Sequence, residues 1–403
     1  MTASWILPRR AFRPRPVADG CLRTMRRPAD HTDVKNTAEA SEPSGGAGTP
    51  PLSNPFRPND ESRTMRHRTA FLLLATSLLL LTGDLAAQRA TGNGLGQVAP
   101  FRATRRFHIR YEVEANRLPR GQDLRAWIPI PSDDPWQRIH NLEVVTDLPW
   151  EIQTEEVYGN RMVYIDTRID ARTARVRVEY DVDRRFRKTD FSGEGGACPL
   201  TENEMKRYLA PSRLVVVDAR ILEQSRKITA GKSDPVEKAR AIYNFVLAKM
   251  TYGKPKNLPW GRGDTRFACD ARVGNCTDFH SWFISLCRAA KIPARFQIGL
   301  FGRYETKRGE EYATGGYHCW AEFYTPRTGW VPVDISEADK HPDRAAEFFG
   351  IHTDNRVTLS TGRDIVLAPR QVGPPLNFFV SPYAEVDGLP FSNIKKTSYW
   401  RDL

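Results

Sequence analysis

The segment from Val273 to Arg295, VGNCTDFHSWFISLCRAAKIPAR, constrains the fold more than any other part of the chain. Apolar side chains recur every three or four residues between Phe279 and Ala290, which is the period of an amphipathic helix. Asn275 is a favourable N-cap, and Asp278, three residues later, completes a capping-box pattern. The sequence therefore predicts a helix with Cys276 in its first turn.

This position makes Cys276 a candidate nucleophile. At a helix N-terminus, unpaired backbone N–H groups and the positive end of the helix dipole stabilise a thiolate. The thiolate, rather than the thiol, is the reactive form of cysteine.

After this helix the apolar residues alternate, which predicts strands at 294–300, 317–324 and 330–334. A hairpin folded about Pro326 would place His318 opposite Asp334 on one face of the sheet, within a residue or two of register. In that arrangement His318 would accept the proton of Cys276, and Asp334 would orient the imidazole ring. These three residues together form the nucleophile, base and orienting acid of a cysteine enzyme.

Three blocks that occur in this order resemble the transglutaminase-like superfamily: GNCTDFHSWFISLCRAAKIPARF, YHCWAEFY and GWVPVDIS. The resemblance covers residues 234–336 and implies a papain-like fold, in which the helix that carries the cysteine packs on an antiparallel sheet. It implies acyl-thioester chemistry on an amide, with Cys276 as nucleophile, His318 as base and Asp334 as orienting acid. Members often have alanine where this chain has Cys319, which strand alternation places on the face away from the site.

The filled triad positions favour an active enzyme, and hydrolysis of peptides or proteins is our first expectation because water is always available outside the cell. Protein crosslinking or deamidation, and a catalytically silent peptide or cell-wall binding module, remain open alternatives. The Cys276 backbone N–H is expected in the oxyanion hole, with Trp260 and Trp320 as candidate oxyanion or cleft residues. Asp278 is interpreted as a helix-start residue. His280, one helical turn beyond Cys276, either supports the site or caps a polar edge, and we favour the second interpretation.

The remaining sequence predicts an α+β protein with two domains. Period-two patterns and turn signals between residues 101 and 190 indicate an all-β sandwich, with Trp127, Trp136 and Trp150 in its core or rim. A glycine-rich break follows, and the catalytic domain is expected from 191 to 403, with helices near 218–229 and 235–249. Short strands after residue 341 are expected to extend the catalytic sheet or to cover the cleft.

The spacing of the cysteines argues against a zinc site, and the charge distribution argues against a nucleic-acid site. A zinc site that uses His280 and His318 is disfavoured, because the spacing of Cys198, Cys269, Cys276, Cys287 and Cys319 contains no CxxC pair. No cofactor is indicated. Residues 88–403 contain 48 basic and 40 acidic side chains, a net charge of +8 without a basic-aromatic cluster, so we expect a peptide or protein substrate and not a nucleic acid. The sequence does not indicate an oligomeric state.

The N-terminal region contains a secretion signal. A basic start at Met65–Arg68, an apolar run from Ala70 to Leu81 and small residues at Ala86–Ala87 are the three parts of a signal peptide, which we assign to residues 65–87. The run is too short to span a bilayer, so no stable membrane anchor is expected after its removal. Residues 1–64 are expected to be disordered or to result from a misassigned start. The mature protein is therefore expected to be secreted or periplasmic.

The exported protein should begin near Gln88, because the small side chains before it form the cleavage site. Amino-terminal sequencing of secreted or periplasmic material checks this expectation. Recovery of an exported chain that still contains residues 1–64 would contradict it.

Overall fold

The computed structural model describes residues 104–192 and 199–403, which lie in one compact unit. Among these residues, two five-stranded sheets form a β-sandwich. The first sheet has the order β11-β18-β1-β6-β3, with β1 at Thr104–Asn116, β3 at Gln137–Val145, β6 at Thr173–Arg185, β11 at Glu311–Ala313 and β18 at Ile394–Asp402. The second has the order β17-β16-β2-β5-β4, with β2 at Asp123–Ile130, β4 at Trp150–Thr154, β5 at Arg161–Arg168, β16 at Tyr383–Val386 and β17 at Leu389–Phe391.

The period-two pattern of the sequence produces the core of the sandwich. Phe107 and Ile109 of β1 are fully buried, and so is Val178 of the neighbouring β6, while the residues between them face outward. Trp127 is buried against Tyr164. The predicted strands in this region are thus confirmed.

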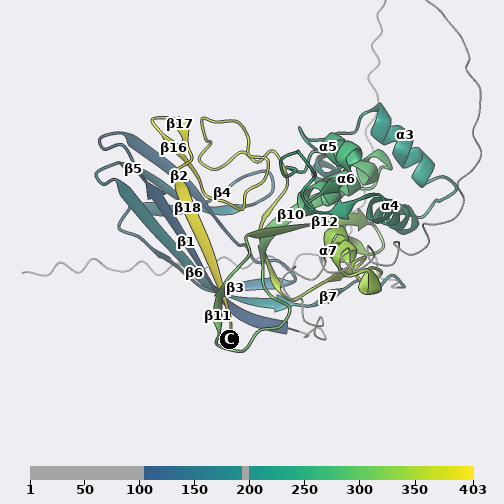
Figure 1. Cartoon of the computed structure of the whole chain (residues 1–403), viewed down its shortest axis with the longest axis horizontal. Helices are drawn as coiled ribbons and strands as arrows, with labels where there is room; N and C mark the ends of the chain where they lie inside the picture. Colours follow the sequence, from purple (N-terminus) through teal and green to yellow (C-terminus); the bar gives the residue numbers. More distant parts are fainter. Residues whose placement is uncertain (1–103, 193–198) are drawn as a thin grey trace, which may run out of the picture. The chain divides into compact units, whose positions relative to one another are not determined.

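The C-terminal residues confirm one part of the expectation and correct another. β15 (Arg356–Thr361) extends the sheet expected for the catalytic domain, whereas β16 and β18 join the sandwich. β18 pairs with β1 over its whole length, and Figure 1 shows the two strands side by side. β16 pairs with β2 in the other sheet. The sandwich therefore contains strands from both ends of the described chain, which sequence order could not reveal because strand pairing is not local.

A third sheet carries the candidate site. It has the order β13-β12-β10-β15, all antiparallel, with β10 at Ala294–Phe301, β12 at Tyr317–Thr325, β13 at Gly329–Val333 and β15 at Arg356–Thr361. Two short pairs lie beside it: β7 (Arg187–Lys188) with β14 (Ile351–His352), and β8 (Thr251–Tyr252) with β9 (Val273–Gly274).

The helices surround α6 (Cys276–Ala289), as Figure 1 shows for α3, α4 and α5. The predicted helices are confirmed as α3 (Ala219–Ile228) and α4 (Pro235–Lys249), whereas α2 (Glu202–Leu209) and α5 (Thr265–Ala271) were not predicted. After β13 the chain forms α7 (Ile335–Lys340) and one turn of 3-10 helix, η1 (Pro342–Arg344). α6 packs on the sheet through contacts such as Phe283 with Phe323, so the expected α+β architecture is confirmed.

No helix in the ranges 104–192 and 199–403 is long and apolar enough to cross a membrane. The predicted signal peptide and Cys198 lie outside the described residues.

Replacing Trp400 by alanine should destabilise the protein by about 3–5 kcal/mol, the usual cost of deleting a large buried aromatic side chain. Trp400 of β18 is fully buried and stacks on Phe107 of β1, with ring centroids 3.6 Å apart. Denaturant unfolding of W400A measures this cost. K395A, on the exposed side of the same strand, is the matched control and should stay within about 0.5 kcal/mol of the parent. Equal effects of the two changes would show that β18 does not contribute to the core.

Candidate active site

The start of α6 holds Cys276 in place. The Asn275 side chain accepts a hydrogen bond from the Thr277 N–H (2.9 Å), and Asp278 Oδ2 accepts one from the Asn275 N–H (3.0 Å). The predicted capping box is therefore confirmed. Cys276 occupies the first helical position and is only 3% exposed.

Asp278 also fixes the loop that precedes the helix, because its Oδ1 accepts the Gly263 N–H at 2.9 Å. Two glycines make room for this carboxylate: a Cβ at Gly261 would lie 2.0 Å from Asp278 Oδ2, and one at Gly274 would lie 2.5 Å from it. Both positions therefore require glycine for steric reasons. The interpretation of Asp278 as a helix-start residue agrees with these contacts.

The β12–β13 hairpin brings His318 to Asp334, but with a register that differs from the expected one. Ala321 pairs with Val333 and Thr325 with Gly329, so Trp320, not His318, is in register with Asp334. The turn closes later than expected because Thr325 and Thr328 hydrogen-bond within it and Gly329 adopts a positive φ of 70°. A shift of two residues keeps the same face of the strand, and therefore the contact survives.

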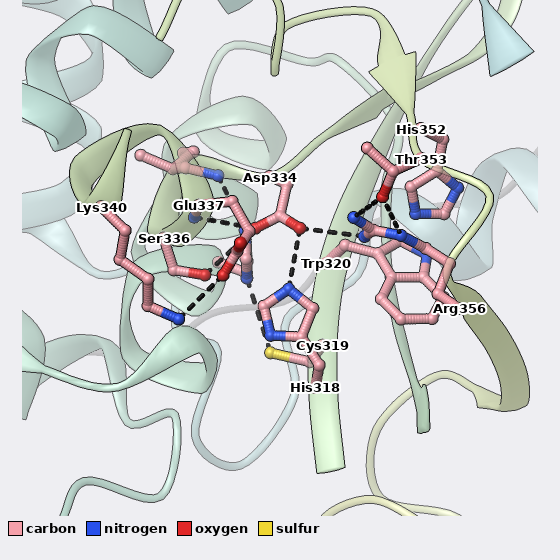
Figure 2. A network of polar contacts seen from close by, with 12 residues as sticks. His318, Cys319, Trp320, Asp334, Ser336, Glu337, Lys340, His352, Thr353 and Arg356 are labelled. Atoms are coloured by element: carbon pink, nitrogen blue, oxygen red, sulfur yellow. Dashed lines mark hydrogen bonds and ion pairs between the residues drawn. The ribbon is translucent and has the colours of Figure 1, made fainter. Parts of the chain in front are cut away.

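Asp334 lies at the centre of a buried polar network (Figure 2). Its Oδ2 accepts hydrogen bonds from His318 Nε2 at 2.8 Å and from Arg356 Nη1 at 2.9 Å. Its Oδ1 accepts from the Ser336 hydroxyl at 3.1 Å and from the Glu337 N–H at 3.2 Å, so Asp334 also caps α7. These contacts satisfy the carboxylate on both oxygens in a site with no solvent exposure.

The neighbouring charges set the ionisation of this pair. Burial opposes the charged forms, but His318 and then Arg356 hold the pKa of Asp334 well below its usual range. Burial likewise disfavours a charged His318, yet the charge and hydrogen bond of Asp334, together with the hydrogen bond to Cys276, raise the pKa of His318 to about 9. His318 is therefore an imidazolium at neutral pH.

Sequence reasoning missed Arg356, which opens β15 in a stretch expected only as a short strand. Its side chain is fully buried, donates to Thr353 Oγ1 through Nε at 3.1 Å, and lies 5.0 Å from the ring centre of Trp320. Nothing in the local pattern marks it, because its partner Asp334 is brought near only by the folded sheet. The only hint is its place directly before the alternating apolar residues Val357 and Leu359, which could have prompted a search for an acidic partner.

Cys276 completes the arrangement. His318 Nε2 is engaged by Asp334, so Nδ1 is the ring nitrogen that remains to hydrogen-bond Cys276. Hydrogen bonds from the Cys319 thiol and then from His318 hold the pKa of Cys276 well below its usual range, against the effect of burial. The structure thus brings together all three residues that the sequence singled out.

Cys319 was expected on the face away from the site, and its position corrects that expectation. His280, for which a polar edge was favoured, is fully buried and contacts Cys319. The alternation of β12 is as expected, since Trp320 packs on His352 whereas Phe323 packs on α6. However, α6 covers the same face of β12 that carries Cys319. The Cys319 sulfur consequently lies 3.5 Å from His280 Nδ1, near the start of α6, where it helps to lower the pKa of Cys276.

The two candidate tryptophans have different surroundings. Trp320 is fully buried and its indole N–H donates to Gln297 Oε1 at 2.7 Å, so this donor is already engaged on the far side of β12. Trp260 is 47% exposed and precedes Gly261, whose carbonyl accepts a hydrogen bond from the Asn275 amide at 3.0 Å. Trp260 therefore lies in the loop next to the start of α6.

The other cysteines have no reactive surroundings. Burial raises the pKa of Cys269 to about 12 and that of Cys287 well above its usual value. All four cysteines within residues 199–403 are free thiols, and no group of three or more metal-binding side chains in the described chain is arranged to hold an ion.

Comparison with known proteins supports the resemblance seen in the sequence. Residues 223–335, which contain Cys276, His318 and Asp334, match the family model of the transglutaminase-like superfamily. This part of the chain is a transglutaminase-like core.

Two bacterial proteins are similar to this chain. An uncharacterized protein of Haemophilus influenzae is 27% identical over 331 residues, which cover 73% of this chain and 89% of the relative. The uncharacterized protein YebA of Bacillus subtilis is 26% identical over 126 residues, which cover 29% of this chain and 17% of YebA.

Solved structures with some similarity include a candidate cysteine protease from Cytophaga hutchinsonii, with a TM-score of 0.49 and 16% identity over 74% of this chain and 91% of that chain. The periplasmic domain of TgpA from Pseudomonas aeruginosa has a TM-score of 0.31 and 17% identity, with 60% of this chain and 91% of that chain covered. Red sea bream transglutaminase has a TM-score of 0.24 and 13% identity, with 54% and 48% covered.

Alkylation of Cys276 by iodoacetamide should stay fast well below pH 8.5, the value near which an ordinary thiol ionises, and should slow only in the acid range. The H318A change removes the imidazolium, so the midpoint of the Cys276 alkylation profile should rise toward the ordinary value. Peptide mapping by mass spectrometry identifies the labelled residue at each pH. Preferential labelling of Cys269 or Cys287, which the structure makes unreactive, would contradict the assignment of Cys276 as the thiolate.

Proposed function

We propose that this protein is a thiol-dependent enzyme that transfers the acyl group of an amide, with Cys276, His318 and Asp334 as its catalytic triad. One observation carries the proposal: His318 Nε2 hydrogen-bonds the Asp334 carboxylate, and the same imidazole lowers the pKa of the Cys276 thiol, which lies at a helix N-terminus. This is the geometry that nucleophilic catalysis by cysteine requires.

The reaction begins when the Cys276 thiolate attacks the amide carbonyl and forms a C–S bond. The carbonyl oxygen becomes an oxyanion, and the C–N bond then breaks as His318 donates its proton to the leaving amine. An acyl-thioester on Cys276 and a neutral His318 result. In hydrolysis, His318 next removes a proton from water, the hydroxide attacks the thioester, and the thiolate and imidazolium are restored.

The backbone N–H of Cys276 supports the oxyanion in this proposal. Cys276 occupies the first position of α6, and a backbone N–H at that position has no partner within the helix. The indole N–H of Trp260, in the adjoining loop, is proposed as a second donor. A preorganised pair of donors stabilises the charge that develops in the transition state.

Asp334 and Arg356 act on His318 in different ways. Asp334 fixes the ring through Nε2 and stabilises its positive charge. Arg356 keeps Asp334 ionised and turned toward the ring. Arg356 therefore serves as a positioning residue and does not touch the reacting atoms.

Peptide or protein hydrolysis is the reaction we propose, in the periplasm or outside the cell. The predicted signal peptide supports the location, and water is the acceptor that such a compartment always provides. Crosslinking and deamidation use the same thioester with another acceptor, and a silent binding module would keep the fold without the chemistry. Products distinguish these outcomes.

Incubation with casein or a peptide library should yield new amino termini. Release of ammonia without cleavage would replace hydrolysis by deamidation or crosslinking, and binding without any product would leave only the binding module.

The kcat/KM should fall as pH rises through about 9, because protonated His318, which supplies the proton for the leaving amine, is lost there.

Variants test the triad itself. C276A should abolish turnover, and H318A should reduce kcat by about three orders of magnitude or more. D334N should cost less than H318A, since the thiolate and the oxyanion donors remain; asparagine is preferred to alanine because it leaves a hydrogen-bond acceptor for buried Arg356. C269A, which removes a buried thiol remote from the triad, is the matched control and should keep parental activity. Parental turnover in C276A would refute the triad.

A further inference from the structure

A second thiol lies against the proposed nucleophile and is not part of the triad. Cys319 is fully buried in β12, next to His318 in sequence, and its side chain faces the start of α6. Its sulfur lies 3.5 Å from Nδ1 of His280, which follows Cys276 by one turn of α6, and its neighbourhood lowers the pKa of Cys276.

The proton positions along this chain of contacts follow from one backbone group. The Ile335 N–H, at the start of α7, donates to His280 Nε2 at 3.1 Å. A backbone N–H is always a donor, so Nε2 must be an acceptor and the proton of neutral His280 must lie on Nδ1. His280 Nδ1 therefore donates, both to the Cys319 sulfur and to the backbone carbonyl of Cys276. Burial lowers the pKa of His280 to about 4, which agrees with a neutral ring.

Because the sulfur of Cys319 accepts from His280, its own S–H is free to turn toward Cys276. Burial and the neighbouring thiolate raise the pKa of Cys319 well above its usual range, so this thiol keeps its proton. The two sulfurs thus have different roles, with Cys319 as donor and Cys276 as acceptor. A weak S–H donor gains strength when the acceptor is charged.

We infer that Cys319 is a positioning residue that donates a hydrogen bond to the Cys276 thiolate, and that the neutral ring of His280 orients this thiol from the Ile335 N–H. This inference rests on the proposed function of Cys276. It adds a support for the thiolate besides His318. His318 must give up its proton to the leaving amine, whereas Cys319 keeps its proton throughout the reaction. The negative sulfur therefore retains one fixed donor when it is released from the acyl-enzyme.

Other titratable groups also face the two thiols and would contribute to any pH profile. Those near Cys276 are Tyr317 and His318 of β12, Asp278 and His280 of α6, Tyr252 of β8 and Lys340 of α7, and those near Cys319 also include Asp334 and Arg363. The test must therefore change the donor alone. Serine at position 319 keeps a donor of nearly the same size, and alanine removes it.

The experiment compares the alkylation profile of Cys276 in the parent, C319A and C319S, with the protein kept reduced and the label located by mass spectrometry. C319A should raise the midpoint by about one pH unit or more, as expected for loss of a hydrogen bond to a charged group. C319S should stay close to the parent. C287A, which removes a fully buried thiol from the body of α6, should leave the midpoint unchanged. At a pH well below both midpoints, kcat/KM of C319A should fall about tenfold, because the thiolate fraction falls by that factor.

Two results would overturn the inference: a parental profile in C319A, or an equal shift in C319A and C319S, which would indicate a packing role. If C319A does not fold, the alkylation profiles of Cys276 in H280N and H280A test the inference instead. Asparagine can keep a hydrogen-bond donor at the Nδ1 position of His280, and alanine cannot. Only H280A should then shift the profile, and equal profiles would overturn the inference. An ordinary thiol profile in the parent would instead contradict the proposed thiolate itself, so the two failures are distinguishable.

Discussion

A single buried carboxylate, Asp334, holds the candidate site together. It receives hydrogen bonds from β12 through His318, from β15 through Arg356 and from the first turn of α7. Removing an ionised group from water is costly, and four partners on two oxygens are needed to offset that cost. The same contacts that satisfy Asp334 therefore fix the position and the charge of His318.

The buried charges alternate along a line from the helix to the sheet. The Cys276 thiolate is followed by the His318 imidazolium, the Asp334 carboxylate and the Arg356 guanidinium. Each charge has an opposite neighbour, so the set is balanced although it lies in the interior. Loss of any one member would leave a buried charge without its partner, which is more costly than the absence of the whole set.

Cys276 also has neutral neighbours, which are not part of this line of charges. Cys319, on the face of β12 that α6 covers, and His280 of α6 lie beside Cys276, and neither carries a charge. Two kinds of support therefore meet at one sulfur: an ion pair that changes as the proton moves, and a fixed set of neutral donors. The dipole of α6 adds to the second kind.

The sequence by itself determined the local elements of the site and the faces of its strands. The cap at Asn275, the start of α6 at Cys276 and the shared face of His318 and Asp334 all follow from periods of 3.6 and 2 residues and from side chains a few residues apart. Only the tertiary structure decided which distant groups meet. The pairing of β18 with β1, the approach of Arg356 to Asp334 and the face of β12 that α6 covers depend on contacts between segments far apart in sequence. No local pattern encodes such contacts, because they form only when several elements bury their apolar faces together.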